Sequence, residues 1–169
     1  SLISAVSEAR PKIADYPFTT LHPNLGVVRV GPLQSFVMAD LPGLIEGAAQ
    51  GHGLGIQFLK HLSRCRVLVH MIDLSERGES EDAVSQFHTI EKELLEYSKT
   101  VSGKHRWLVF NKIDLLPEEE QQSTVRKVCE DIGWQGPVYA ISTVTRVGLD
   151  QLCNDIHGYL VKQESEHEQ

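Results

Sequence analysis

The residues best suited to chemistry are the tetrapeptide Asn111-Lys112-Ile113-Asp114, which directly follows an apolar run at residues 107–110. A carboxylate accepts hydrogen bonds only, so Asp114 can take both donors on one edge of guanine, the N1–H and the exocyclic amino group. Adenine presents an acceptor and a donor at that edge, which makes one of the two contacts repulsive. These residue types therefore suit selection of a guanine base. By itself, the tetrapeptide is equally consistent with a polar turn that closes a strand.

A second motif, Asp40-Leu41-Pro42-Gly43, follows the apolar run 36–39. D-x-x-G after one strand and N-K-x-D after a later strand is the ordered pair expected of a GTP-binding domain. Asp40 would hold Mg²⁺ through a water molecule, because Mg²⁺ gives up its hydration shell reluctantly. Gly43 lets the backbone N–H approach a γ-phosphate and donate to it, and loss of that phosphate would release the segment that follows.

Other segments have two open interpretations. Residues 44–55 contain four glycines among twelve positions and are either a second nucleotide-dependent switch or a flexible surface connection. Thr19 and Thr20 could complete Mg²⁺ coordination, or could simply favour the strand that follows. Residues 142–144 close the last expected strand, which by itself suggests an ordinary loop with a helix cap. His22, next to the threonine pair, could touch nucleotide or water, but we favour a surface or structural role for it. No histidine has a zinc-binding spacing.

Composition narrows the class of protein. With 169 residues, of which 41% are hydrophobic and 23% charged, the chain suits one globular domain. The net charge of −7 disfavours non-specific binding to RNA or DNA backbones. The three cysteines are scattered, which favours a reducing compartment and no disulfide. No stretch approaches the length of a membrane span and no basic-then-apolar leader opens the chain, so we expect no membrane association and a cytoplasmic location.

Strand patterns and helical patterns alternate along the chain. Such alternation predicts an α/β fold: a doubly wound, mostly parallel sheet with helices on both faces and an antiparallel edge strand. Ligands of such sheets bind at the carboxyl ends of strands, where both motifs lie. We expect one domain over residues 1–162 and a frayed or disordered tail over residues 163–169. The expected strands are residues 25–30, 35–40, 67–73, 107–110 and 138–142, the first two forming a hairpin, and the expected helices are residues 58–65, 83–97, 117–132 and 148–160.

Several segments together match one known pattern. They are Ala14-Asp15-Tyr16-Pro17-Phe18-Thr19-Thr20-Leu21, Asp40-Leu41-Pro42-Gly43-Leu44-Ile45-Glu46-Gly47-Ala48, Gly53-Leu54-Gly55, Phe58-Leu59-Lys60-His61, Cys65, Asn111-Lys112-Ile113-Asp114 and Ile141-Ser142. On these residues the chain resembles the GTPase domain of the Obg family, ribosome-associated GTPases of the translation-factor class. The likeness covers nearly the whole chain.

The resemblance implies a P-loop NTPase-type fold that hydrolyses GTP to GDP and phosphate as a slow, Mg²⁺-dependent switch. It also implies the large ribosomal subunit as partner, in ribosome assembly. Thr20 matches the family's Mg²⁺-coordinating threonine, with Asp40 as the second metal ligand. Thr143 stands where the family usually has alanine, a change that leaves backbone contacts in place. The residues matched to GTP binding are Phe18, Thr19, Thr20, Leu21, His22, Asp40, Leu41, Pro42, Gly43, Asn111, Lys112, Ile113, Asp114, Ser142, Thr143 and Val144.

Two departures from the wider pattern of switch GTPases bear on activity. Leu44 stands where many of them place a water-orienting glutamine, so hydrolysis should be slow, and the Obg family shares this apolar residue. The phosphate-binding loop G-x-x-x-x-G-K-[ST] does not occur in the chain. The strand before that loop would lie between those at 35–40 and 67–73. We therefore expect the natural protein to continue upstream of Ser1 and this segment alone to be inactive. The alternative is a guanine-nucleotide-binding scaffold that hydrolyses nothing.

Overall fold

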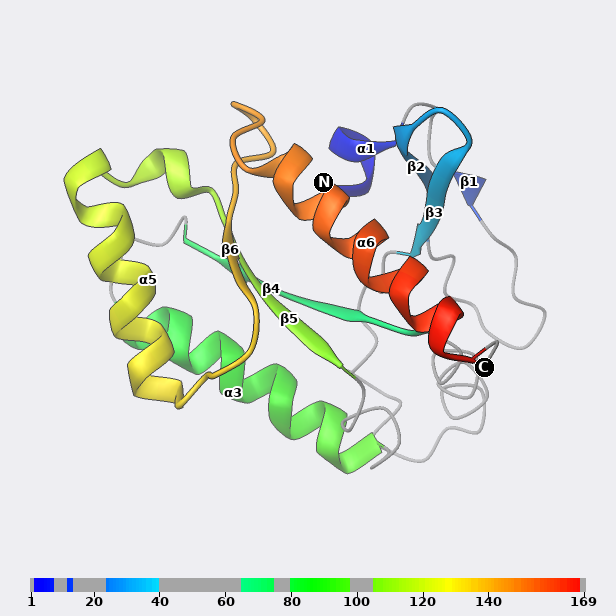
Figure 1. Cartoon of the computed structure of the whole chain (residues 1–169). Coiled ribbons are helices and arrows are strands. Elements are labelled where there is room, and N and C mark those ends of the chain that lie inside the picture. Colours follow the sequence, from blue (N-terminus) through cyan, green and yellow to red (C-terminus); the bar gives the residue numbers. More distant parts are fainter. Residues whose placement is uncertain are drawn as a thin grey trace.

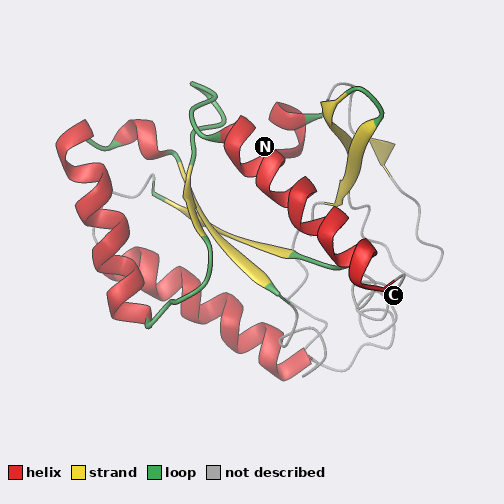
Figure 2. Cartoon of the chain, viewed as in Figure 1, coloured by secondary structure: helices red, strands yellow, loops and turns green. Residues whose placement is uncertain are grey.

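The computed structural model describes residues 2–7, 12–13, 24–39, 65–74, 80–97 and 105–167. Within them, helices and strands alternate (Figures 1 and 2). The strands are β1 (Lys12–Ile13), β2 (Asn24–Gly31), β3 (Gln34–Ala39), β4 (Leu68–Asp73), β5 (Arg106–Asn111) and β6 (Val138–Ala140). The helices are α1 (Leu2–Val6), α3 (Ser80–Tyr97), α5 (Glu118–Ile132) and α6 (Leu149–His167), with a 3₁₀ helix η1 (Ile113–Leu115).

Strands β4, β5 and β6 form a parallel sheet with β5 in the middle. Successive side chains of a strand point to opposite faces. Leu108 and Phe110 of β5 therefore pack with α3 and α5, whereas Trp107 and Val109 pack with α6, and all four are buried. Figure 1 shows α3 and α5 on one side of this sheet and α6 on the other. Helices cover both faces, as expected, and the core lies in two layers around β5.

Strands β1, β2 and β3 form a second, antiparallel sheet. Its β2–β3 hairpin confirms the one expected at residues 25–30 and 35–40. Helix α1 lies close against β2 at Gly26, where an added Cβ would come within 2.8 Å of Ile3 Cγ2. A residue without a side chain is what permits this approach.

The described strands form two three-stranded sheets rather than the single sheet that we expected, and β3 and β4 do not pair. The α/β class is confirmed, because a parallel sheet lies between helices on both faces.

The expected helices and strands that lie in the described residues are confirmed, with shifts of one to three residues at most ends and an α6 that continues from the expected end at 160 to His167. Helix α5 begins after Pro117 and has three glutamates in its first turn, where negative charge is favoured by the helix dipole. It ends at Gly133, whose left-handed backbone (φ 70°) lets its N–H donate to the carbonyls of Cys129 and Glu130. The helix expected over residues 58–65 lies outside the described residues except for Cys65.

Residues 163–167, where we expected a frayed or disordered tail, are helical in the structure, because α6 continues to His167. Side chains in these last turns form hydrogen bonds: Gln163 Nε2 donates to the Tyr159 hydroxyl at 2.6 Å, and the Arg66 guanidinium donates to the Glu164 carboxylate at 3.0 Å. Residues 168–169 lie outside the described part. None of the described helices, α6 included, is both long and apolar enough to cross a membrane.

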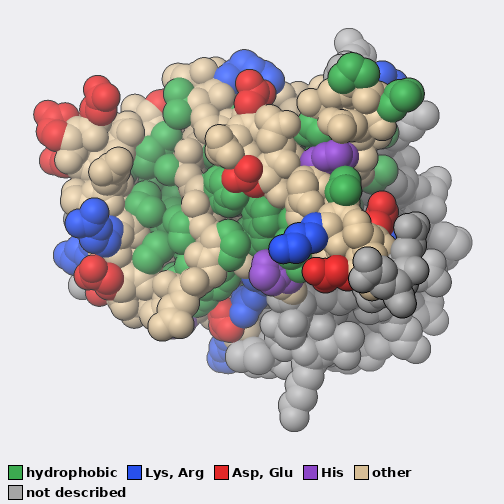
Figure 3. Space-filling model, viewed as in Figure 1, with side chains coloured by type: hydrophobic (Ala, Val, Ile, Leu, Met, Phe, Trp, Pro, Cys, Tyr) green, Lys and Arg blue, Asp and Glu red, His purple; other side chains and the backbone are tan. Residues whose placement is uncertain are grey.

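The edge strand β6 is only partly covered. Hydrophobic side chains show at the surface on either side of it, between α5 and α6 (Figure 3). Val138 of β6 is one of the exposed large hydrophobic residues. At the other edge of this sheet, β4 ends at Asp73, whose polar contacts connect it to Lys112, directly after β5, and to α3.

Candidate functional site

The structure places seven of the sixteen residues matched to GTP binding. The tetrapeptide Asn111-Lys112-Ile113-Asp114 lies at the carboxyl end of β5, and residues 142–144 lie in the turn between β6 and α6. These are the carboxyl ends of neighbouring parallel strands, so the two segments meet at one edge of the sheet. The other nine lie outside the described residues: Phe18, Thr19, Thr20, Leu21, His22, Asp40, Leu41, Pro42 and Gly43.

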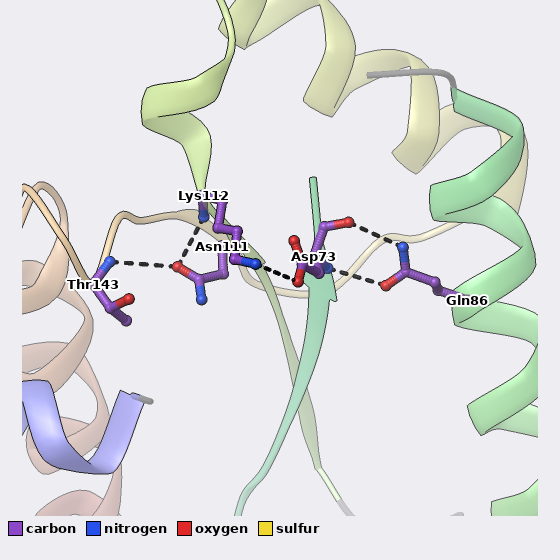
Figure 4. A network of polar contacts seen from close by, with 5 residues as sticks. All are labelled: Asp73, Gln86, Asn111, Lys112 and Thr143. Carbon is purple, nitrogen blue, oxygen red and sulfur yellow. Dashed lines mark hydrogen bonds and ion pairs between the residues drawn. The ribbon is translucent and has the colours of Figure 1, made fainter. Parts of the chain in front are cut away.

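Asn111 joins the two segments. Its Oδ1 accepts a hydrogen bond from the backbone N–H of Lys112 at 2.8 Å and a longer one from the N–H of Thr143 at 3.4 Å (Figure 4). The N–H of Ile113 also donates to the carbonyl of Ile141 at 3.1 Å. The backbone of the tetrapeptide is thereby tied to the turn that follows β6.

A left-handed residue turns the chain after β5. Lys112 has φ 67° and ψ 34°, a conformation that costs a residue with a side chain roughly 1–2 kcal/mol. The turn continues as η1, in which Ile113 is 3% exposed and packs in the core while Asp114 is exposed. Gln121 of α5 braces η1 by donating to the carbonyls of Ile113 and Leu116. The turn is thus held at Ile113 and Leu116 and leaves Asp114 exposed.

Hydrogen bonds between its own residues stabilise the turn after β6. Ser142 is fully buried, and its Oγ accepts a hydrogen bond from the N–H of Thr145 at 3.0 Å. Its backbone N–H donates to Val147 and its carbonyl accepts from Arg146. Val144 is 79% exposed, at the outer side of the turn.

Two residues outside the motifs complete this network. The Asp73 carboxylate, at the end of β4, lies 2.9 Å from the Lys112 ammonium. Gln86 of α3 uses both ends of its side-chain amide on the backbone of Asp73, accepting from its N–H at 3.1 Å and donating to its carbonyl at 3.0 Å (Figure 4). Asp73 had a sequence signal, as a polar residue that closes a strand, whereas the helical periodicity around Gln86 gives none.

No group of three or more histidine, cysteine, aspartate or glutamate side chains in the described residues is arranged to hold a metal ion. The two expected Mg²⁺ ligands, Thr20 and Asp40, lie outside that part of the chain. The polar network around Lys112 lies among the residues that we expected to contact the base.

Comparison with solved structures shows the fold. The chain is 21% identical to a nucleolar GTP-binding protein 1 from Plasmodium falciparum, with a TM-score of 0.63 over 99% of this chain and 81% of that one. The cytosolic domain of the T. maritima FeoB iron transporter in its GMPPNP form gives 19% identity and a TM-score of 0.62, over 94% of this chain and 57% of that one. A point variant of Aquifex aeolicus Era bound to GDP and AlF4⁻ gives 20% and 0.62, over 94% and 51%.

The chain thus spans little more than half of the second and third of these structures, and at these identities the likeness shows the P-loop GTPase fold alone. The family follows from the sequence match, in which the model described as 50S ribosome-binding GTPase covers residues 1–112. Because this match takes in well over half of the 169 residues, the chain belongs to the family of 50S ribosome-binding GTPases.

Proposed function

We propose that this chain is the nucleotide-binding part of a protein that hydrolyses GTP to GDP and phosphate as a slow, Mg²⁺-dependent switch. The observation that carries the proposal is the meeting of residues 111–114 with residues 142–144 at the carboxyl edge of the parallel sheet. Family membership supports the same activity.

Guanine recognition is the best-supported part. Asp114 is exposed at the end of a turn that Ile113 anchors in the core, so its two acceptor oxygens can meet the N1–H and amino group of the base. Asn111 holds the facing turn, whose backbone N–H groups would approach the guanine O6. A base with a different donor pattern leaves Asp114 with a repulsive contact, and sites of this kind discriminate by roughly 10⁴–10⁵-fold.

The roles at the phosphate end rest on the sequence. Thr20 and Asp40 would hold Mg²⁺, which when bound neutralises phosphate charge. The N–H of Gly43 would sense the γ-phosphate. Leu44 can neither polarise nor orient water, so slow hydrolysis is expected.

Membership of the Obg subfamily, action in the cytoplasm and a part in assembly of the large ribosomal subunit belong to the same proposal. They rest on the specific segments 14–21 and 40–48 and on the 50S ribosome-binding description of the family. The GTP-binding protein names of similar structures agree with nucleotide binding.

Titration of the full-length gene product with labelled GDP and ADP, with and without Mg²⁺, tests the proposal. We expect tight Mg²⁺-assisted GDP binding, much weaker ADP binding, and slow phosphate release from GTP. Tight GDP binding without any phosphate release would support the alternative, a non-hydrolysing scaffold. Equal affinity for GDP and ADP would refute guanine recognition by Asp114.

A further inference from the structure

The side chain of Gln86, on α3, makes a pair of hydrogen bonds to one residue of the neighbouring strand. Its amide bonds both backbone groups of Asp73, the last residue of β4, and so fastens α3 to the end of that strand. Only a side chain with one acceptor and one donor side by side can do this, because Asp73 offers an N–H and a carbonyl. Glutamate, of nearly the same shape, would place an acceptor against the carbonyl.

Asp73 lies opposite Asn111 in the parallel pair β4–β5, and the N–H of Leu74 donates to the Asn111 carbonyl at 3.1 Å. Its carboxylate reaches the Lys112 ammonium at 2.9 Å. Both side chains are nearly half exposed, at 46% and 41%, so the ion pair itself adds little stability. The pair nevertheless joins the end of β4 to the Lys112 side chain.

The orientation of Lys112 matters because its left-handed backbone sets the direction of η1 and hence of Asp114. A residue in such a conformation persists only where its surroundings hold it. Here Asn111 holds its N–H, Leu115 bonds its carbonyl, and Asp73 holds its side chain. Gln86 bonds the backbone of Asp73 and so contacts the residue that provides the third of these interactions (Figure 4).

We propose that Gln86 is a positioning residue for guanine binding: by clamping the end of β4 from α3 it holds Asp73 against Lys112, and so sets how long guanine nucleotide remains bound. The proposal rests on the base site proposed above. On this proposal, the hydrogen bonds that join α3 to the end of β4 help to set the rate of nucleotide exchange.

The test measures dissociation of fluorescent GDP from the full-length gene product. Gln86→Met keeps the length of the side chain but removes both hydrogen bonds, and should speed dissociation about two- to fivefold. Gln163→Met is the matched control: Gln163 is also a part-buried helix glutamine, and it bonds Tyr159 on α6 away from the base site. It should leave the dissociation rate unchanged.

A double-mutant cycle separates positioning from a general loss of stability. If Gln86 acts through Asp73, Gln86→Met should have no further effect on dissociation in an Asp73→Ala background. Equal rates for Gln86→Met and wild type, or full additivity with Asp73→Ala, would overturn the inference while leaving guanine binding intact. Failure of the wild-type protein to prefer GDP over ADP would instead refute the site on which the inference rests.

Discussion

Replacement of Gly148 by alanine tests the geometry of the turn beside the base site. Gly148 lies between residues 142–147 and α6, and its carbonyl accepts the hydrogen bond from Leu152 that begins the helix. Its backbone is left-handed, with φ 78°. A Cβ at this position would lie 2.5 Å from the carbonyl oxygen of Ala140 and 3.1 Å from Ile141 Cγ2. The first of these neighbours is backbone of β6 and cannot rotate away.

Two costs add in this variant. The left-handed conformation costs a residue with a Cβ roughly 1–2 kcal/mol. Overpacking against a fixed neighbour costs about 1–3 kcal/mol more. We therefore expect Gly148→Ala to lower the free energy of unfolding by roughly 2–5 kcal/mol, a large share of the 5–15 kcal/mol of a typical domain.

Gly133→Ala is the matched control. Gly133 is also left-handed, at φ 70°, but an added Cβ there would meet no atom within 4 Å beyond its own neighbours. Only the backbone cost applies, so the loss should be about 1–2 kcal/mol. Urea unfolding of the full-length gene product, followed by tryptophan fluorescence, compares the two. Equal losses for both variants would show that the close approach of Gly148 to β6 does not govern stability.

Three further predictions follow from single residues. Asp114→Asn should shift the nucleotide preference from guanine to xanthine, because an amide donor then faces the O2 of xanthine; retained guanine preference in competition binding would contradict the assigned role. Burial, with the nearby Arg106 charge, lowers the pKa of His70 from 6.5 to about 4, so the unfolded chain binds the extra proton between those values. Through His70 alone, the free energy of unfolding should therefore fall by roughly 3 kcal/mol as pH drops through that window. His70→Phe should remove this contribution and leave that of other groups, such as Glu91, whose pKa is lowered by its hydrogen bond with Arg106. Phe110→Ala, at a fully buried position, should lower the free energy of unfolding by about 3–5 kcal/mol. Val161→Ala, at an exposed position, should change it by no more than about 0.5 kcal/mol, and thermal unfolding compares the two variants.

Much of the local structure could be predicted from the sequence. Apolar runs and helical periodicity located β4, β5, α3 and α5, because burial of one face imposes a pattern on neighbouring residues. The acidic first turn after Pro117 likewise marked the start of α5. The motif Asn111-Lys112-Ile113-Asp114 could be placed at the end of a strand for the same reason.

The sequence by itself thus determined most of the elements, their alternation and the motif, since these depend on residues close together in the chain. Only the tertiary structure decided which distant residues meet. Asn111 accepts a hydrogen bond from Thr143, and Gln86 bonds the backbone of Asp73, whose carboxylate pairs with Lys112. In the last turns of α6, Glu164 accepts a hydrogen bond from Arg66. These contacts join residues from 13 to 98 positions apart. They depend on strand order and register, which a local pattern of apolar and polar residues does not specify.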